Sequence, residues 1–299
     1  MGSASKARPE RWGSVMFRTF RVRATLIGLV AWMLAGCAGP VAQRPQDEAA
    51  ADALAVGPDR EALARSVPPD YVVSILDASG GVAAWTQNKR LRAAGVVKLY
   101  RPDDSFYLTQ HEFEVYPWSN AVRIAAGEPR GKFVWQMVAG RFEMVEGTPA
   151  TDVSPLYGAY AGYADAFLQI VTAPVRLLDA GNQLYRQPTP FRVGGQWYER
   201  IEVKFAPGMI AVEGGEPDDQ RMSQPYWTDG VFYVNRASAL VDTIWLANPT
   251  NQEYLTVRGY DYSDVKTAGV RVPSKVEIFR AGPDGTVQNR LAQIDIKGQ

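Results

Sequence analysis

The side chains that most often carry enzyme chemistry are scarce in this chain of 299 residues, which has one histidine and one cysteine. His111 alternates with Tyr107, Thr109, Phe113 and Val115, so we expect a buried, hydrogen-bonded histidine; a functional histidine is the alternative. Metal sites usually need clustered His or Cys ligands, and the sequence has no such cluster. It therefore predicts no metal site.

Carboxylate pairs are the remaining candidates for catalysis. Asp103-Asp104 follows a proline, and Asp218-Asp219 lies in a polar loop, so both pairs are expected to be solvated turns. The glycines form no phosphate-binding motif. We therefore predict a protein that is not an enzyme and has no cofactor. A pair of scattered carboxylates, as in glycosidases, stays open as a third-ranked alternative.

The cysteine lies in Leu34-Ala35-Gly36-Cys37, at the end of the apolar run 24–34 and after six basic residues. A basic segment, a short apolar segment and small residues are the three parts of an export signal. The run is shorter than the roughly 20 apolar residues that span a bilayer. It resembles the lipobox of bacterial lipoproteins, which implies cleavage between Gly36 and Cys37 and a lipid anchor on Cys37. An ordinary N-terminal anchor with an incidental cysteine is the alternative.

The resemblance also implies a location. Residues 1–36 would be the signal peptide, and acyl chains such as palmitate on Cys37 would bind membrane lipid. Ala38 rather than aspartate follows the cysteine, which favours the outer membrane, facing the periplasm. Translation could begin at Met1 or at Met16. We expect residues 37–68 to be a flexible tether; an N-terminal helix docked on the body is the alternative.

Charge and composition narrow the class of the exported part. Without residues 1–36 the chain has 26 basic against 31 acidic residues, a net charge of −5, which gives no footprint for nucleic acid. A single cysteine forms no internal disulfide, so stability must come from an apolar core. Eight tryptophans and fourteen tyrosines suit β-structure and apolar pockets.

Alternation of apolar and polar residues predicts a series of strands after a broken helix at 71–85. Short, turn-forming links indicate an antiparallel arrangement, and a sheet this long should curl. The expected strands are 93–101, 105–116, 121–126, 132–138, 141–146, 191–193, 196–205, 231–235, 240–246, 253–262, 270–280 and 286–296.

A helical insertion at 154–180 interrupts the strands. Ser154-Pro155 is a helix-start pattern, and Tyr157, Tyr160, Tyr163 and Phe167 recur at helical spacing up to Pro174. This helix either covers the open side of the sheet or forms a lid over a ligand cavity. The intervening segment 206–225 is expected to be a polar loop.

Two stretches resemble outer-membrane lipoprotein-sorting-like (LolA/LolB-like) proteins. They are Gly80-Gly81-x-x-x-Trp85 and the run 260–278, with Gly269 and Pro273 between two strands. The resemblance covers 71–296 and implies one domain, 69–299, with an α+β fold. Such a fold is mainly β with helices: a strongly curved antiparallel sheet forms an unclosed β-barrel with a helical lid. Members of that family carry lipoprotein acyl chains or bind lipids.

These features together predict a membrane-anchored periplasmic lipoprotein that binds lipid or acyl chains in an apolar cavity. In the alternative, the same aromatic residues fill the core, and the protein is an envelope structural or sensor lipoprotein with a protein partner. The residues expected to line the cavity are Tyr107, Phe113, Trp135, Met137, Phe142, Tyr160, Tyr163, Phe167, Trp197, Ile201 and Phe205.

Overall fold

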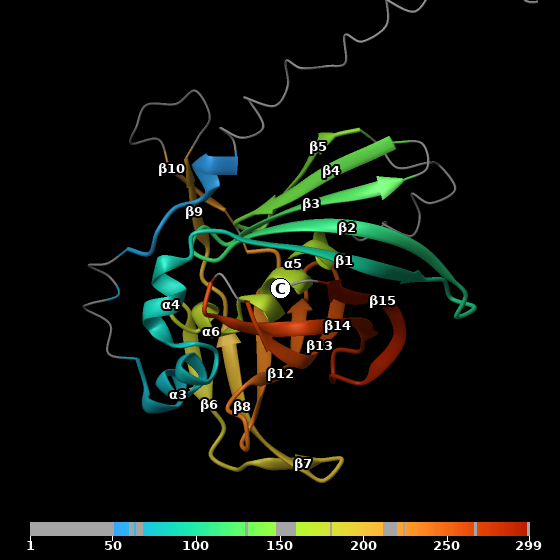
Figure 1. The fold of residues 1–299 in the computed structure, drawn as a ribbon. Coiled ribbons are helices and arrows are strands. Elements are labelled where there is room, and N and C mark those ends of the chain that lie inside the picture. The colour runs from blue at the N-terminus through green and yellow to red at the C-terminus, as the bar shows by residue number, and fades with distance from the viewer. Residues whose placement is uncertain are drawn as a thin grey trace, which may run out of the picture. The chain divides into compact units, whose positions relative to one another are not determined.

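The computed structural model describes residues 51–59, 63, 68–128, 131–147, 160–179, 181–211, 220–223, 225–265 and 268–297 (Figure 1). The predicted signal peptide, Cys37, Asp218-Asp219 and the start of the helical insertion lie outside the described residues. Within them, no helix has the length and apolar character to cross a membrane.

One thirteen-stranded, wholly antiparallel sheet dominates the described residues, and β9 (Gly208–Ala211) and β10 (Gln220–Ser223) form a separate pair. The sheet contains β1 (Leu91–Tyr100), β2 (Phe106–Tyr116), β3 (Ala121–Glu128), β4 (Gly131–Val138), β5 (Arg141–Glu146), β6 (Gln183–Arg186), β7 (Phe191–Val193), β8 (Gln196–Lys204), β11 (Asp229–Asn235), β12 (Val241–Asn248), β13 (Glu253–Asp264), β14 (Arg271–Ala281) and β15 (Val287–Lys297).

The order of the strands explains why the barrel stays open. It runs β5-β4-β3-β2-β1-β15-β14-β13-β12-β11-β8-β6, with β7 paired to β8. The first and last strands pair in the middle, Val97 opposite Ile294. The two edges are therefore β5 and β6, which follow each other among the strands of the chain. The curved, unclosed antiparallel sheet confirms the predicted fold class.

Two helices connect these edges. They are α5 (Tyr160–Val171) and α6 (Ala173–Arg176), separated at Thr172 just before Pro174. Helix α5 lies inside the curve of the sheet (Figure 1) and contacts β12, β13 and β14 on one half and β3, β4 and β5 on the other. Every residue from Gly162 to Leu177 is buried.

Side-chain alternation sets which face of the sheet meets α5. On β2, Thr109, His111, Phe113 and Val115 are buried, whereas Glu112 on the opposite face is exposed. This matches the alternation predicted from the sequence, because successive side chains of a strand point to opposite faces. The concave face is therefore the apolar core, and the outer face is polar.

Helices α3 (Asp70–Ala78) and α4 (Gly81–Gln87) form the predicted broken helix. Trp85 is fully buried, and its Nε1 donates to Ser79 Oγ over 3.0 Å. The amide of Arg271 donates to the Ser79 carbonyl over 2.8 Å. The glycine motif and the loop before β14 are thus neighbours, which gives a structural reason for both stretches that carried the family resemblance.

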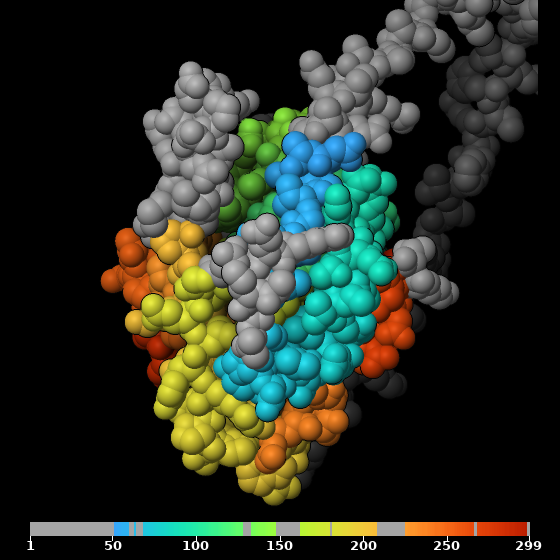
Figure 2. All heavy atoms as spheres, turned by 90° about the vertical axis from the view of Figure 1, so that its left-hand side faces the viewer, coloured from blue at the N-terminus to red at the C-terminus, as the bar shows by residue number. Residues whose placement is uncertain are grey.

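The tether is shorter than predicted, because residues 51–55 pack on the domain. Ala51 is 4% exposed and lies against Tyr116 and Ala121, and Arg90 forms an ion pair with Asp52 at 3.6 Å. Figure 2 shows this segment, in blue, against neighbouring strands. The docked-helix alternative therefore holds for residues 51–55.

Two elements were absent from the sequence prediction. Strand β6 is four residues long and largely exposed, so it lacks the apolar alternation that identifies a half-buried strand. The segment 206–225, expected to be a loop, contains the β9–β10 hairpin. Its glycine-rich composition hid two short strands.

Gly80 provides a test of how α4 docks. Its φ is +113°, and a Cβ there would lie 2.3 Å from the Gly269 carbonyl oxygen. Gly80→Ala is expected to lower the free energy of unfolding by about 3 kcal/mol or more, through backbone strain and collision. Gly194→Ala is the matched control, since its φ is +55° and its Cβ would meet nothing within 4 Å. It should cost about 1 kcal/mol. Urea unfolding measures both, and equal losses would contradict the close approach.

Candidate functional site

The structure brings most of the predicted cavity residues together on the concave face. Tyr107 and Phe205 are partly buried and pack against the core. The fully enclosed members, each at most 8% exposed, are Phe113, Trp135, Met137, Tyr163, Phe167 and Ile201. The side chain of Tyr160 lies outside what the structure describes. The predicted site is therefore a real cluster in space, formed from both halves of the sheet and from α5.

The prediction that Phe142 and Trp197 are enclosed is wrong, because these side chains are 37% and 50% exposed. Phe142 is opposite the buried Met137, but it lies on the edge strand β5, beyond which no strand of the sheet adds cover. Trp197 lies in the β7–β8 hairpin, which extends past the body of the sheet (Figure 1). Alternation predicted which face of the strand these side chains lie on, but it could not predict where the buried core ends.

Helix α5 fills the curve of the sheet with close ring contacts. Phe167 stacks on Phe113 with ring centroids 4.3 Å apart. Tyr163 Oη lies 3.1 Å from His111 Nδ1. Such offset or edge contacts between aromatic rings stabilise a core beyond simple area burial. The space predicted to hold a ligand is thus occupied by the helix predicted to be its lid.

A line of polar residues on this helical segment was missed by the sequence prediction. Asp165, Gln169, Thr172 and Arg176 are at most 3% exposed. Their spacing of four, three and four residues places them along one helical face. The sequence contains that spacing, but the apolar residues between these positions form a stronger helical pattern on the other faces.

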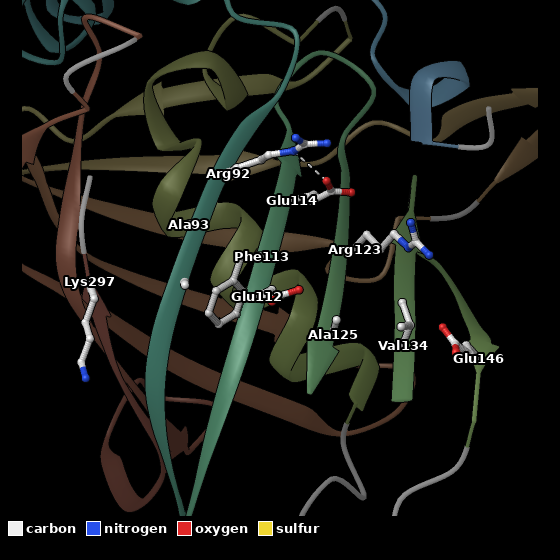
Figure 3. A pocket seen from close by; sticks show the side chains of 11 residues that line it. Arg92, Ala93, Glu112, Phe113, Glu114, Arg123, Ala125, Val134, Glu146 and Lys297 are labelled. Atoms are coloured by element: carbon white, nitrogen blue, oxygen red, sulfur yellow. Dashed lines mark hydrogen bonds and ion pairs between the residues drawn. The ribbon is translucent and has the colours of Figure 1, made fainter. Parts of the chain in front are cut away.

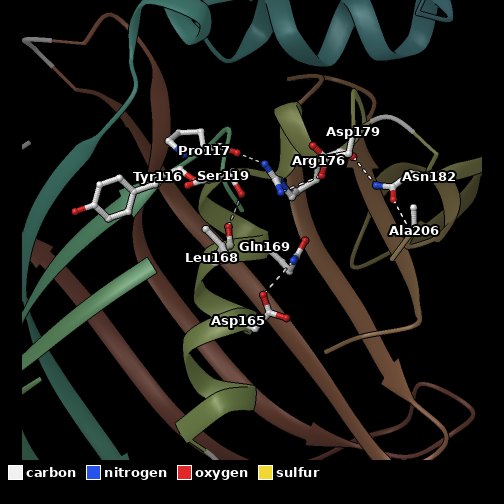
Figure 4. A network of polar contacts seen from close by, with 11 residues as sticks. Tyr116, Pro117, Ser119, Asp165, Leu168, Gln169, Arg176, Asp179, Asn182 and Ala206 are labelled. Atoms are coloured by element: carbon white, nitrogen blue, oxygen red, sulfur yellow. Dashed lines mark hydrogen bonds and ion pairs between the residues drawn. The ribbon is translucent and has the colours of Figure 1, made fainter. Parts of the chain in front are cut away.

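These polar side chains bind one another and the ends of strands (Figure 4). Gln169 Nε2 donates to Asp165 Oδ1 over 3.2 Å. Arg176 donates through Nη2 to the Pro117 carbonyl and pairs through Nη1 with Asp179 at 2.9 Å. Arg176 therefore fixes α6 to the turn between β2 and β3.

The polar groups are not fully paired. Gln169 Oε1, Arg176 Nε and Trp227 Nε1 are buried without a hydrogen-bond partner. An unpaired buried donor or acceptor costs about 1–3 kcal/mol, because its contact with water is lost and not replaced. The packing of α5 in the sheet is therefore less favourable than that of an all-apolar core of the same volume.

Burial also sets the ionisation of His111 and Asp165. It lowers the pKa of His111 from 6.5 to about 3, so the imidazole is neutral at physiological pH. It raises the pKa of Asp165 from 3.8 to about 6, although Gln169 and Arg176 oppose the rise. His111 touches Tyr163 rather than open solvent, which fits the predicted structural histidine.

A separate hollow of about 560 Å³ lies across the outer face of β1 to β5 (Figure 3). Ala94 and Ala125 flank Glu112 across neighbouring strands and leave room above the sheet. Arg92 pairs with Glu114 at 2.9 Å on its wall. Charges of both signs are mixed along it, so it favours no ligand charge.

No metal-binding group of three His, Cys, Asp or Glu residues occurs among the described residues. Glu112, Glu114 and Glu146 all line the hollow of Figure 3, together with Arg92, Arg123 and Lys297. The polar line of Figure 4 is buried. The concave face can therefore exclude water and hold apolar groups.

Comparison with known proteins gives a likeness of fold. No family model and no curated protein matches the chain. A LolA superfamily protein of Nitrosomonas europaea is 9% identical, with a TM-score of 0.44 over 78% of this chain and 93% of its own. A DUF1329 family protein of Desulfovibrio piger is 10% identical, with a TM-score of 0.40 over 81% and 92%.

A third solved structure is an outer membrane lipoprotein-sorting protein domain of Vibrio parahaemolyticus. It is 7% identical, with a TM-score of 0.39 over 77% of this chain and 89% of its own.

The buried carboxyl of Asp165 should make stability depend on pH. Its pKa is raised in the folded state, so ionising it disfavours folding as the pH rises through about 6. Asp165→Asn keeps the shape and removes the charge. It is expected to raise the free energy of unfolding by about 2–3 kcal/mol at about pH 8, with a gain that shrinks as the pH falls below 6. Urea titrations across this range measure the effect.

The exposed aspartate Asp77, on α3, offers the matched control. Asp77→Asn should leave the pH profile of stability as it is in the unmodified protein. A gain from Asp165→Asn that is the same at every pH would mean that burial of the charge is not its cause.

Proposed function

We propose that this protein is a lipid-anchored envelope lipoprotein, not an enzyme, that binds an acyl chain on the concave face of its sheet. In this proposal α5 occupies the site when no ligand is bound and gives way to the ligand. The observation that carries it is the imperfect pairing of a buried helix, in which Gln169 Oε1 of α5 has no hydrogen-bond partner.

The energetics favour such an exchange. Each methylene of a guest chain that leaves water contributes roughly 0.8 kcal/mol. The faces that α5 covers are aromatic and apolar, including Phe113, Trp135 and Ile201. The polar line of α5 would recover hydrogen bonds to water when the helix moves outward. The ligand would replace the apolar contacts that the sheet makes with α5, and the polar side chains of the helix would return to water.

The filled interior favours a second candidate. Phe167 stacks on Phe113 and Phe133 stacks on Trp135, with ring centroids 4.3 and 5.1 Å apart. Such close stacking is typical of a well-packed core. With α5 permanently in place, the protein would be an envelope structural or sensor lipoprotein that contacts a protein partner through its outer face. The two candidates differ in whether α5 leaves the sheet.

A reversible cross-link between α5 and β13 separates them. A Cβ at Gly162 would lie 3.4 Å from Glu253 Cδ, so the two positions are neighbours, and Gly162→Cys with Glu253→Cys is the pair to oxidise. The mass of the oxidised protein verifies that the disulfide has formed before uptake is measured. The purified full chain is mixed with a fatty acid whose fluorescence rises in apolar surroundings. We expect uptake by the reduced double variant, at least tenfold weaker uptake after oxidation, and recovery with reductant.

Glu253→Cys alone, oxidised in the same way, is the matched control and should keep its uptake. Uptake that is equal in the oxidised and reduced double variant would show that α5 need not move. Absence of uptake in the unmodified protein, with no lipid in its native mass spectrum, would favour the structural lipoprotein.

The anchor has its own test. Cys37→Ser removes the thiol that would carry the acyl chains, so incorporation of a labelled palmitate analogue in growing cells should fall to background. The unmodified chain should be labelled and recovered with the membranes. Labelling of the Cys37→Ser variant, or an unlabelled parent, would contradict the lipobox interpretation without bearing on the concave site.

A further inference from the structure

The β7–β8 hairpin exposes three large apolar side chains. Phe191, Val193 and Trp197 are 37%, 52% and 50% exposed. The hairpin extends from one end of the sheet (Figure 1) and turns at Gly194-Gly195, both with positive φ. Exposed apolar residues scattered singly are ordinary, but a cluster at a projecting tip marks a contact surface.

The apolar side chains lie on both faces of this hairpin. Opposite residues of antiparallel strands share a face, and Phe191 is opposite Tyr198 whereas Arg192 is opposite Trp197. Phe191 leans on Tyr198 and Tyr233, with ring centroids 6.2 and 5.5 Å apart. Trp197 points to the other face, where the Arg192 guanidinium lies 5.9 Å from its ring.

Positive charge surrounds the exposed apolar groups. Arg192 lies at the tip, beside Trp197. Arg186 and Arg236 lie at the base of the hairpin, where both contact Glu199, at 2.6 and 3.6 Å. Arg200 pairs with Glu202 on the adjoining part of β8 at 3.5 Å. Asp242 also lies at the base of the hairpin, where its Oδ2 accepts from Tyr198 Oη over 3.3 Å. Four arginines against three carboxylates leave a local excess of one positive charge, on a chain whose predicted exported part is net negative.

We propose that the β7–β8 hairpin inserts into the headgroup region of an anionic bilayer. A protein partner would cover one face of a narrow two-stranded hairpin, whereas a bilayer surrounds both. Trp and Phe favour the membrane interface, and Arg192 can keep its charge among the headgroups while its stem stays in apolar surroundings. Arginines near anionic lipid add electrostatic attraction.

The backbone is suited to this environment. Val193 pairs with Gln196 and Phe191 with Tyr198, so the backbone groups between the two strands are bonded to each other. The outward backbone groups of β7, which pairs with β8 alone, are unpaired in the hairpin and need water or headgroup partners, so the hairpin is suited to the headgroup region and not to the hydrocarbon core. The proposal concerns how the body rests on a membrane, and it stands whether or not α5 exchanges with a ligand.

The test uses the full chain, reconstituted in vesicles of phosphatidylcholine with phosphatidylglycerol. An environment-sensitive fluorescent amino acid replaces Val193 in one protein and Leu108 in another. Leu108 is the matched control, because it is an exposed aliphatic side chain at 57%, in β2. We expect emission at 193 to shift to shorter wavelength and to be quenched by brominated lipid, with neither change at 108.

A second set of proteins carries the reporter at 193 together with Arg192→Gln and Trp197→Ser. The shift should be lost there, and in vesicles of phosphatidylcholine alone it should be reduced. Equal emission and equal quenching at 193 and 108 in anionic vesicles would overturn the proposal. So would a shift at 193 that persists in the double substitution, since it would not depend on the residues invoked.

Discussion

The packing of α5 into the curve of the sheet is the interaction on which the rest of the structure depends. Thirteen antiparallel strands bend until β5 and β6 become the edges of an unclosed barrel. An open apolar face of that size cannot remain in water. The chain itself supplies the cover, because the segment between the two edges contains α5, which contacts strands of both halves. Connectivity therefore places the helix where the gap in the barrel requires one.

Helix α5 is buried on all sides, yet it carries a polar line. Asp165 and Gln169 bond within the helix, and Arg176 reaches out to Pro117 and Asp179. Arg176 thereby fixes the end of the helical segment, while Gln169 Oε1 in α5 stays unpaired. A core selected only for stability would replace these groups with apolar ones of similar volume, because buried polar networks are favourable only when complete. The incomplete pairing is what distinguishes this helix from a plain structural filler.

Much of the fold was predictable because it is local. Alternation placed His111 and Phe113 correctly, and the glycine pair before Trp85 marked a real break between two helices. The misses are of another kind. The exposure of Trp197 depends on where the sheet ends, which no periodicity records. The pairing of β1 with β15 and the position of α5 inside the curve depend on contacts between residues far apart in the sequence. Local patterns therefore could not decide whether α5 is a lid over a cavity or fills the core.

In the proposed exchange, the position of α5 inside the sheet limits how tightly an acyl chain can bind. If a ligand binds only to molecules in which α5 has left the sheet, its apparent affinity is the intrinsic affinity multiplied by the fraction of such molecules. If that fraction were about 1%, affinity would fall about a hundredfold, or about 3 kcal/mol. About four buried methylenes offset that amount. A short acyl chain would then bind weakly, whereas a long chain has a surplus. Under the proposed exchange, the closed arrangement would select for chain length rather than for a particular polar contact, since displacement of α5 would set a threshold that only extended apolar ligands exceed.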